Sequence, residues 1–153
     1  MTDSPEIRKE LEVAAQLVHE YLPIFAARGF SYVQMHVETS KVVADSAVFP
    51  FENQSTGMKI RLAYFPPYHD IQRSFVLTIT NHRGEKLYVN EYLRVHKRFE
   101  HLEQFTDRGD STSLKAFWAN FFKTLEDLFS TDLKEILEGK EWEAVPFNWG
   151  DYR

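Results

Sequence analysis

The feature that most constrains this chain is the alternation of apolar and polar residues between Met58 and Val95. A period of two is typical of β-strands that pack on one side only, because successive side chains of a strand point to opposite faces. We read three strands from this stretch. Their apolar face contains Met58, Ile60, Leu62, Phe75, Leu77, Ile79, Leu87, Val89 and Leu93, and their polar face contains Lys59, Arg61, Thr78, Thr80, Lys86, Tyr88, Asn90, Tyr92 and Arg94. The polar face is free to meet solvent or a ligand.

Two further strands are predicted upstream. The segment Ser31–Glu38 alternates Val33, Met35 and Val37 with Tyr32, Gln34, His36 and Glu38, and a second strand is expected over Lys41–Phe49. Pro50 and the polar segment Glu52–Gly57 then predict a turn or loop. The connection Phe65–Arg73, which contains two prolines, is expected to be irregular. A tight hairpin is predicted at Asn81–Glu85, around Gly84. These short connections favour an antiparallel sheet.

A helix is predicted to begin at Ser4-Pro5-Glu6, where a serine cap, a proline in the first turn and an acidic residue come together. Its buried stripe is expected to contain Ile7, Leu11, Ala14, Val18, Leu22 and Phe25. Pro23 removes one backbone donor and predicts a kink or a restart nearby. Gly29 is the expected end of the helix, because glycine readily adopts the left-handed conformation.

A second long helix is predicted near the C-terminus. Several capping residues at 110–113 precede a stripe that contains Leu114, Phe117, Trp118, Phe121, Leu125 and Leu128. A break at Ser130–Asp132 and a final turn that ends at Gly139 are expected to follow. The segment His96–Asp110 fits a short helix and a loop equally well.

Two flanking helices and about five mainly antiparallel strands define an α+β two-layer sandwich, with the N-terminal and C-terminal helices packed on one face of the sheet. A length of 153 residues predicts a single domain over 1–153. Residues 142–153 form an aromatic tail in an acidic context. We expect this tail to dock on its own domain, because large rings rarely stay in water, and insertion into a partner is the alternative.

Composition excludes several classes of protein. The chain has no cysteine, which removes disulfides, thiolate nucleophiles and cysteine-based zinc sites. Its net charge of −5 argues against nucleic-acid binding by bulk electrostatics. The first thirty residues carry Glu6, Glu10, Glu12 and Glu20 and so lack the apolar run of a secretory signal. These observations predict a cytoplasmic protein that does not span a membrane.

The motifs of catalysis and cofactor binding are missing from the sequence. The glycines are too widely spaced for a phosphate-binding loop or a dinucleotide fingerprint, so no cofactor is expected. His96 and His101 are five residues apart, which is poor spacing for metal ligands, and no metal is expected. An enzyme is the third-ranked alternative, and it would need a pocket near His36 or His69.

The sequence therefore favours a non-catalytic protein-binding module, of the adaptor, dedicated chaperone, inhibitor or immunity type. A single-stranded nucleic-acid or small-ligand binder that uses the same sheet face is the alternative, because rings and cations on a sheet can stack on and neutralise a strand. A second copy of the chain is a further candidate partner. The expected contact residues are Tyr32, His36, Arg61, Tyr88, Tyr92 and Arg94 on the open face, or Trp142, Phe147 and Trp149 in the tail.

Overall fold

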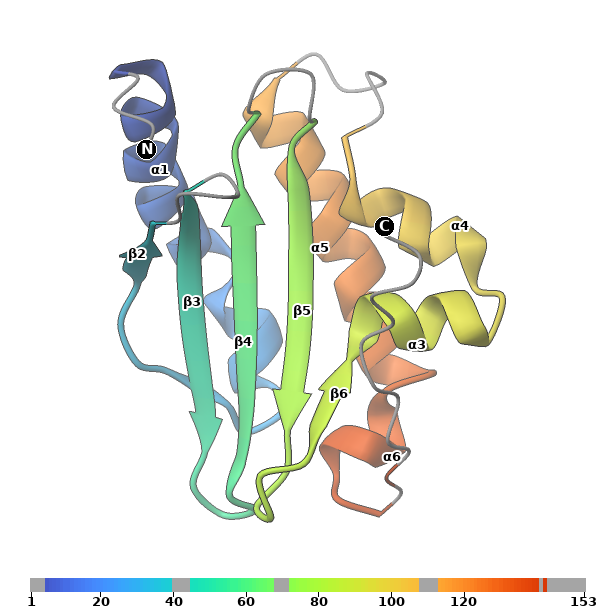
Figure 1. Ribbon diagram of the computed structural model, residues 1–153. Helices are drawn as coiled ribbons and strands as arrows, with labels where there is room; N and C mark the ends of the chain where they lie inside the picture. The colour runs from blue at the N-terminus through green and yellow to red at the C-terminus, as the bar shows by residue number, and fades with distance from the viewer. Residues whose placement is uncertain (1–4, 40–44, 68–71, 108–112, 141, 143–153) are drawn as a thin grey trace.

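The computed structural model describes residues 5–39, 45–67, 72–107, 113–140 and 142 of the chain. It confirms the α+β two-layer architecture, with helices on one face of an antiparallel sheet (Figure 1). The strands follow the order β1-β3-β4-β5-β6, and β2 also pairs with β3. They are β1 (Ser31–Tyr32), β2 (His36–Glu38), β3 (Ser46–Asn53), β4 (Met58–Phe65), β5 (Ser74–Thr80) and β6 (Lys86–Tyr88).

The helices come from both ends of the chain and from the segment after β6. They are α1 (Pro5–Leu17), the short 3-10 helix η1 (Val18–Glu20), α2 (Leu22–Ala26), α3 (Val89–Val95), α4 (Phe99–Leu102), the 3-10 helix η2 (Glu103–Phe105), α5 (Leu114–Ser130) and α6 (Lys134–Leu137). In Figure 1, α1 and α5 lie behind the sheet, and α3 and α4 lie beyond β6. The segment 96–110, for which helix and loop were equal alternatives, thus contains two short helices, and residues 108–110 lie outside the described residues.

The core between the sheet and the helices is built from aromatic rings. Phe75 of β5 stacks on Phe121 of α5 with ring centres 3.9 Å apart, and Phe25 of α2 stacks on Phe51 of β3 at 3.8 Å. Trp118 is completely buried between them and the sheet. Each ring buries a large apolar area, and stacked or edge-on pairs add to that stabilisation. The apolar faces predicted for β4 and β5 are therefore confirmed.

The N-terminal helix is broken where the sequence predicts. α1 passes into η1, Tyr21 interrupts the helix, and Pro23 is the second residue of α2, where its missing N–H costs no helical hydrogen bond. Gly29 follows with a φ of +85°. Ser4, the expected cap, lies outside the described residues. At the other end of the chain, Ser113 caps α5 by accepting a hydrogen bond from the N–H of Ala116 at 3.2 Å, as expected.

The strand expected at Lys41–Phe49 is displaced along the chain. β3 runs from Ser46 to Asn53, so the turn predicted at Pro50 is wrong there, and residues 41–44 lie outside the described part. Pro50 fits inside the strand because its carbonyl accepts from the N–H of Val33, on the edge side. The backbone N of a strand residue points the same way as its carbonyl, so the missing donor of Pro50 faces the gap between β1 and β2.

The two hairpin turns use asparagine and glycine. The turn between β3 and β4 begins at Asn53, and Gly57 in it has a φ of +76° and donates to the Asn53 carbonyl at 2.8 Å. The predicted hairpin between β5 and β6 is present. Asn81 donates its N–H to the carbonyl of Glu85 at 3.0 Å, and Gly84 has a φ of +81°. Both turns therefore need glycine for its freedom at positive φ.

The third predicted strand is wrong beyond Tyr88, because α3 replaces it. Val89 and Leu93 are four residues apart and completely buried, so one helical turn buries the same two side chains that the strand was expected to bury. Glu91, which an extended strand would turn into the apolar face, instead accepts from Arg94 at 2.6 Å. The residues of α3 therefore leave the polar sheet face.

Asn90 continues the sheet edge where β6 stops. Its Oδ1 accepts a hydrogen bond from the N–H of Leu77, and its Nδ2 donates to the carbonyl of Phe75, both at 3.1 Å. A side-chain amide has one acceptor and one donor group, as a strand residue does, so this asparagine substitutes for the missing strand.

The predicted strand Ser31–Glu38 is interrupted by a bulge. Tyr32 pairs with Phe51 of β3, and His36 pairs with Val48, so residues 33–35 face only two residues of β3. One extra residue shifts the alternation, because the side-chain period of a strand is two. Even-numbered side chains before the bulge and odd-numbered side chains after it therefore point to the same face of the sheet.

Candidate functional site

The bulge places one predicted contact residue, Tyr32, on the helix side of the sheet. Its ring lies 5.4 Å from that of Phe51 and 5.9 Å from that of His19, measured between ring centres. Burial raises the pKa of the Tyr32 hydroxyl, and a hydrogen bond with the backbone of Met35 opposes this effect. The expectation that Tyr32 lies on the open face is therefore wrong.

Tyr92 and Arg94 also leave the open face, because both belong to α3. The Tyr92 ring packs on His96 with centres 4.3 Å apart. Arg94 donates to Glu91 through two nitrogens, at 2.6 and 3.1 Å. Their expected place beside Tyr88 on a third strand was wrong, and the cause is the change from strand to helix after β6.

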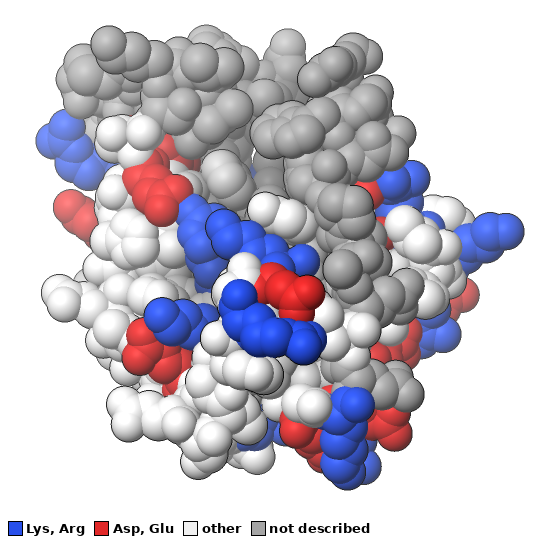
Figure 2. All heavy atoms as spheres, turned by 60° about the horizontal axis from the view of Figure 1, so that its bottom comes forward, with Lys and Arg blue, Asp and Glu red and all other residues white. Residues whose placement is uncertain are grey.

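The open face brings together His36, Glu38 and Arg61 of the predicted contact region. Glu38 accepts from His36 at 3.2 Å and forms an ion pair with Arg61, across from β2 to β4. The hydrogen bond from Arg61 lowers the pKa of Glu38; burial opposes the effect and His36 assists it. Tyr88 lies on the same face but two strands from Arg61, on the far side of β5. Figure 2, which brings the turn end of the sheet forward, shows basic side chains interleaved with acidic ones.

The aromatic tail is described at one residue. Trp142 is partly buried against the core, and its indole nitrogen is buried without a hydrogen-bond partner. Phe147 and Trp149 lie outside the described residues, as do Tyr68, His69 and Asp70. The contact with the core is thus described for Trp142, and the docking of residues 143–153 stays a prediction.

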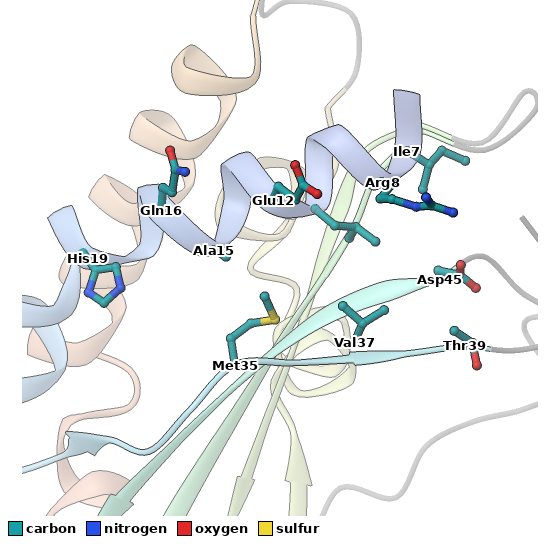
Figure 3. A pocket seen from close by; sticks show the side chains of 11 residues that line it. Ile7, Arg8, Glu12, Ala15, Gln16, His19, Met35, Val37, Thr39 and Asp45 are labelled. Atoms are coloured by element: carbon teal, nitrogen blue, oxygen red, sulfur yellow. The ribbon is translucent and has the colours of Figure 1, made fainter. Parts of the chain in front are cut away.

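A groove of about 660 Å³ separates α1 from the sheet edge at β2 (Figure 3). One wall is a helical stripe with a spacing of four, and the other is a strand face with a spacing of two. The helical stripe contains Ile7, Leu11, Ala15 and His19, and the strand face contains Met35, Val37 and Thr39. A volume of this size is typical of ligand pockets.

The backbone of β2 faces outward beside this groove. The carbonyl of Pro50 points toward the sheet edge. Val48, two residues away, therefore also directs its backbone N–H and C=O to that side, where they bond His36. Ala47 directs its own backbone groups toward β4. Val37, opposite Ala47, therefore turns its N–H and C=O away from β3. No described strand pairs with this outer side of β2.

Apolar side chains are also exposed along this edge. Val33 is 53% exposed and Val37 is 46% exposed, and both belong to the small set of large hydrophobic side chains that are exposed in the described part of the chain. The groove and the exposed backbone therefore form one continuous surface, which we call the β2 edge groove and define by the residues that line it on α1 and at 35–39.

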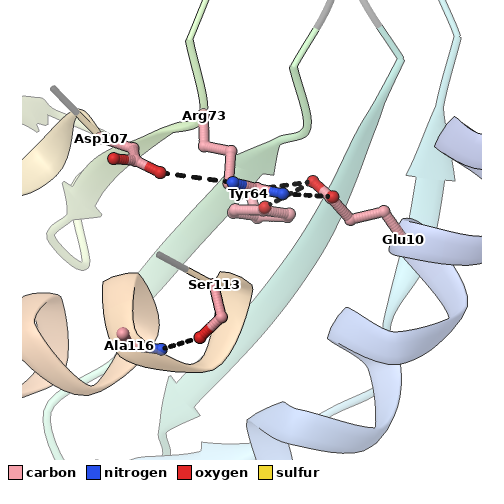
Figure 4. A network of polar contacts seen from close by, with 6 residues as sticks. All are labelled: Glu10, Tyr64, Arg73, Asp107, Ser113 and Ala116. Carbon is pink, nitrogen blue, oxygen red and sulfur yellow. Dashed lines mark hydrogen bonds and ion pairs between the residues drawn. The ribbon is translucent and has the colours of Figure 1, made fainter. Parts of the chain in front are cut away.

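A polar network holds α1 against the sheet above this groove (Figure 4). Tyr64 of β4 donates to Glu10 of α1 at 2.7 Å, and Arg73 contacts Glu10 at 3.0 Å and Asp107 at 3.3 Å. Burial raises the pKa of the Tyr64 hydroxyl, and the charge and hydrogen bond of Glu10 act in the same direction. Because Glu10 lies on α1, the network fixes the helical wall of the groove.

The groove could not be found from sequence patterns alone. Alternation placed Met35 and Val37 on the apolar face of a strand, but the tilt of α1 away from the edge strand leaves them lining the groove.

Comparison with protein-family models, with curated proteins and with solved structures gives no match for this chain. Within the described ranges, no group of three or more histidines and acids is arranged to hold a metal ion. The helices of the same ranges include none that is long and apolar enough to cross a membrane.

Proposed function

We propose that this protein is a non-catalytic protein-binding module that accepts an extended segment of a partner protein along the β2 edge groove. The observation that carries the proposal is the coincidence of an apolar groove with a strand edge on which none of the described strands pairs. In strand addition, the backbone of the partner bonds the free edge, and alternate side chains enter pockets beside it. Both requirements are met at β2.

The geometry of the groove matches that mode of binding. An incoming strand would bond the outward N–H and C=O of Val37, and its inward side chains would lie between Ile7, Leu11 and Ala15 on one side and Met35 on the other. β2 has three residues and follows a bulge, so the edge offers a short docking segment. Short, bulged edges resist unselective pairing, so the groove residues would select the partner.

The single-stranded nucleic-acid alternative has less support from this geometry. It needed Tyr32, Tyr88 and Tyr92 on one face, and of these three Tyr88 lies there. The basic residue Arg61 is paired with Glu38. Phosphate contacts would also show a steep loss of affinity with added salt, which a groove of apolar side chains should not show.

The proposal is tested by panning the full chain against a displayed library of random dodecapeptides and mapping the selected peptides by amide hydrogen exchange. We expect a selected peptide to slow exchange at the Val37 amide and to leave the already bonded Leu77 amide unchanged. Protection confined to another surface, or selection of no peptide, would overturn the proposal.

Two variants at one position separate the backbone from the side chain. Val37→Pro removes the outward donor without removing a bond to β3, and Val37→Ala shortens the side chain but keeps the donor. We expect the proline variant to lose about tenfold more peptide affinity than the alanine variant, which corresponds to about 1.4 kcal/mol. Light scattering at several concentrations distinguishes a second copy of the chain as the occupant, since self-association through this edge would then be lost in Val37→Pro.

A further inference from the structure

We infer that the segment bound along the β2 edge groove carries a cationic side chain, lysine or arginine, that pairs with Asp45. The inference rests on the proposed function and specifies its partner. The carboxylate of Asp45 is buried in the fold without a described hydrogen-bond partner for one of its oxygens.

Asp45 is 7% exposed, and its Oδ1 is buried without a hydrogen-bond partner among the residues that the structure describes. Buried polar groups in proteins are nearly always paired, because an unpaired group loses its bonds to water and gains nothing in return. A carboxylate in this state needs an explanation. A cationic group of a bound ligand would supply the missing partner, and it would also explain why the carboxylate lies at the groove.

The position of Asp45 is at one end of the β2 edge groove (Figure 3). It lies one residue before β3 and, by strand alternation, on the same side of the sheet as Ala47, whose side chain is in the core. Thr39 lines the same end of the groove from the edge segment. A side chain that follows the groove past Val37 therefore reaches the carboxylate.

The charged groups around this end of the groove come from α1. Arg8 and Glu12 both line the groove, and Arg8 makes no hydrogen bond to the unpaired Oδ1. Glu12 adds a second negative charge to the same cavity. Arg8 contributes one positive charge and the two carboxylates two negative charges, so the cavity keeps a net negative charge. An incoming cation could donate to Oδ1, whereas an acidic side chain could not.

The test is a double-mutant cycle between the chain and a peptide selected from the library. The peptide is made with its basic residue and again with norleucine in its place, and each form is titrated against the wild-type chain and Asp45→Asn. We expect norleucine to weaken binding to the wild type at least tenfold and to Asp45→Asn less than threefold. Glu12→Gln is the matched control, because Glu12 is exposed, and it should show a smaller coupling.

The free chain gives a second readout that needs no ligand. Because Asp45→Asn removes an unpaired buried carboxylate, we expect it to raise the urea midpoint of the free chain while it lowers affinity for the basic peptide. A lower midpoint together with an equal loss of affinity for both peptides would assign Asp45 a structural role and overturn the inference.

The two proposals fail separately. Peptides that protect Val37 but lack an enriched basic position, or that show no coupling to Asp45, would remove the inference and leave the proposed function in place. Absence of any peptide at the groove would remove the proposed function, and the inference with it.

Discussion

The two terminal strands of the sheet, β2 and β6, have different surroundings. At the β6 edge, Asn90 bonds the backbone of β5 where β6 stops. Farther along, Ser74 forms a bridge with Thr106, and the N–H of Asp107 donates to the carbonyl of Arg73 at 2.8 Å. β5 is therefore bonded on this side by a strand, a side chain and a loop in succession, and β6 is the terminal strand, with no described strand on its outer side.

At the other end of the sheet, β1 and β2 bond β3 in the same way, and no described strand pairs with the outer side of β2. β1 and β2 pair with β3 alone, and Val33 and Val37 are exposed. An unpaired edge is a template for pairing with another chain, and proteins usually cover one. Each terminal strand thus has an outer side on which no described strand pairs, and β2 differs from β6 in the apolar groove that lies beside it, which supports a binding role there.

The largest loss of stability is expected when the side chain that bonds β5 beyond the end of β6 is removed. Asn90→Ala removes two hydrogen bonds and leaves backbone groups of Leu77 and Phe75, both completely buried residues, without partners. We expect a loss of about 2–4 kcal/mol in the free energy of unfolding, measured by urea denaturation. Gln34→Ala, an exposed position at the bulge of the other edge, is the control and should change stability by less than about 0.5 kcal/mol. Equal effects of the two changes would contradict the contrast between the edges.

The next largest effect on stability is expected at alkaline pH, and it comes from the polar network around Arg73. The pKa of Tyr64 is raised in the folded chain, chiefly by burial. Below about pH 10 both the folded and unfolded states keep the proton, whereas above it the unfolded chain ionises first. Stability should therefore fall by up to about 1.4 kcal/mol per pH unit above pH 10 through this group.

Tyr64→Phe tests this by removing the ionisable group. The variant should start less stable at neutral pH, because it lacks the bond to Glu10, and should lose less stability from pH 10 to 11. Tyr32→Phe is the control at the open edge, where the ring is only partly buried. If both variants keep the wild-type slope, the network does not control alkaline unfolding.

A smaller effect is expected from the proline at the bulge. Pro50→Ala restores an N–H that points into the gap between β1 and β2, where the described chain offers no paired strand residue. The variant should lose about 0.4–1 kcal/mol, because alanine gives the unfolded chain more conformational freedom. A gain in stability would show that the new N–H finds an acceptor and that the edge is less open than the register indicates.

The smallest effect belongs to Glu38 on the open face. Its pKa is lowered, first by the hydrogen bond from Arg61, so it contributes stability above its unfolded pKa and loses it as the pH falls through the folded pKa. The side chain is 48% exposed, so the contribution should be at most about 0.5 kcal/mol. Glu38→Gln should flatten the acid limb of the stability curve slightly, and the difference should vanish in 1 M salt. A larger, salt-resistant effect would contradict the view of this pair as a surface contact.

Much of the fold was predictable because helices and strands leave different periods in the sequence. The stripe of α5, the interruption near Pro23 and the faces of β4 and β5 follow from spacing alone. The error at α3 arose because Val89 and Leu93 fit both periods. Glu91 was the discriminating residue, since a strand would have buried its charge without a partner.

The candidate site was less predictable, because it depends on how elements lie relative to one another. Alternation assigned Tyr32 and His36 to one face, and it could not reveal the extra residue between them. The β2 edge groove needs the tilt of α1, and the unsatisfied state of Asp45 needs the surroundings of its oxygen. Neither the tilt of α1 nor the surroundings of the Asp45 oxygen can be inferred from the residue spacing within one segment.

Because of the bulge, the number of residues between Tyr32 and His36 also decides which side chains of the edge segment face the groove. Adding or removing two residues between Tyr32 and His36 would preserve which side chains enter the groove, whereas a change of one residue that kept the bulge would exchange Met35 and Val37 for His36 and Glu38. The groove would then be lined by an imidazole and a carboxylate in place of two apolar side chains. A one-residue change that shifted the strand in this way would thus alter the surface that we propose for binding the partner.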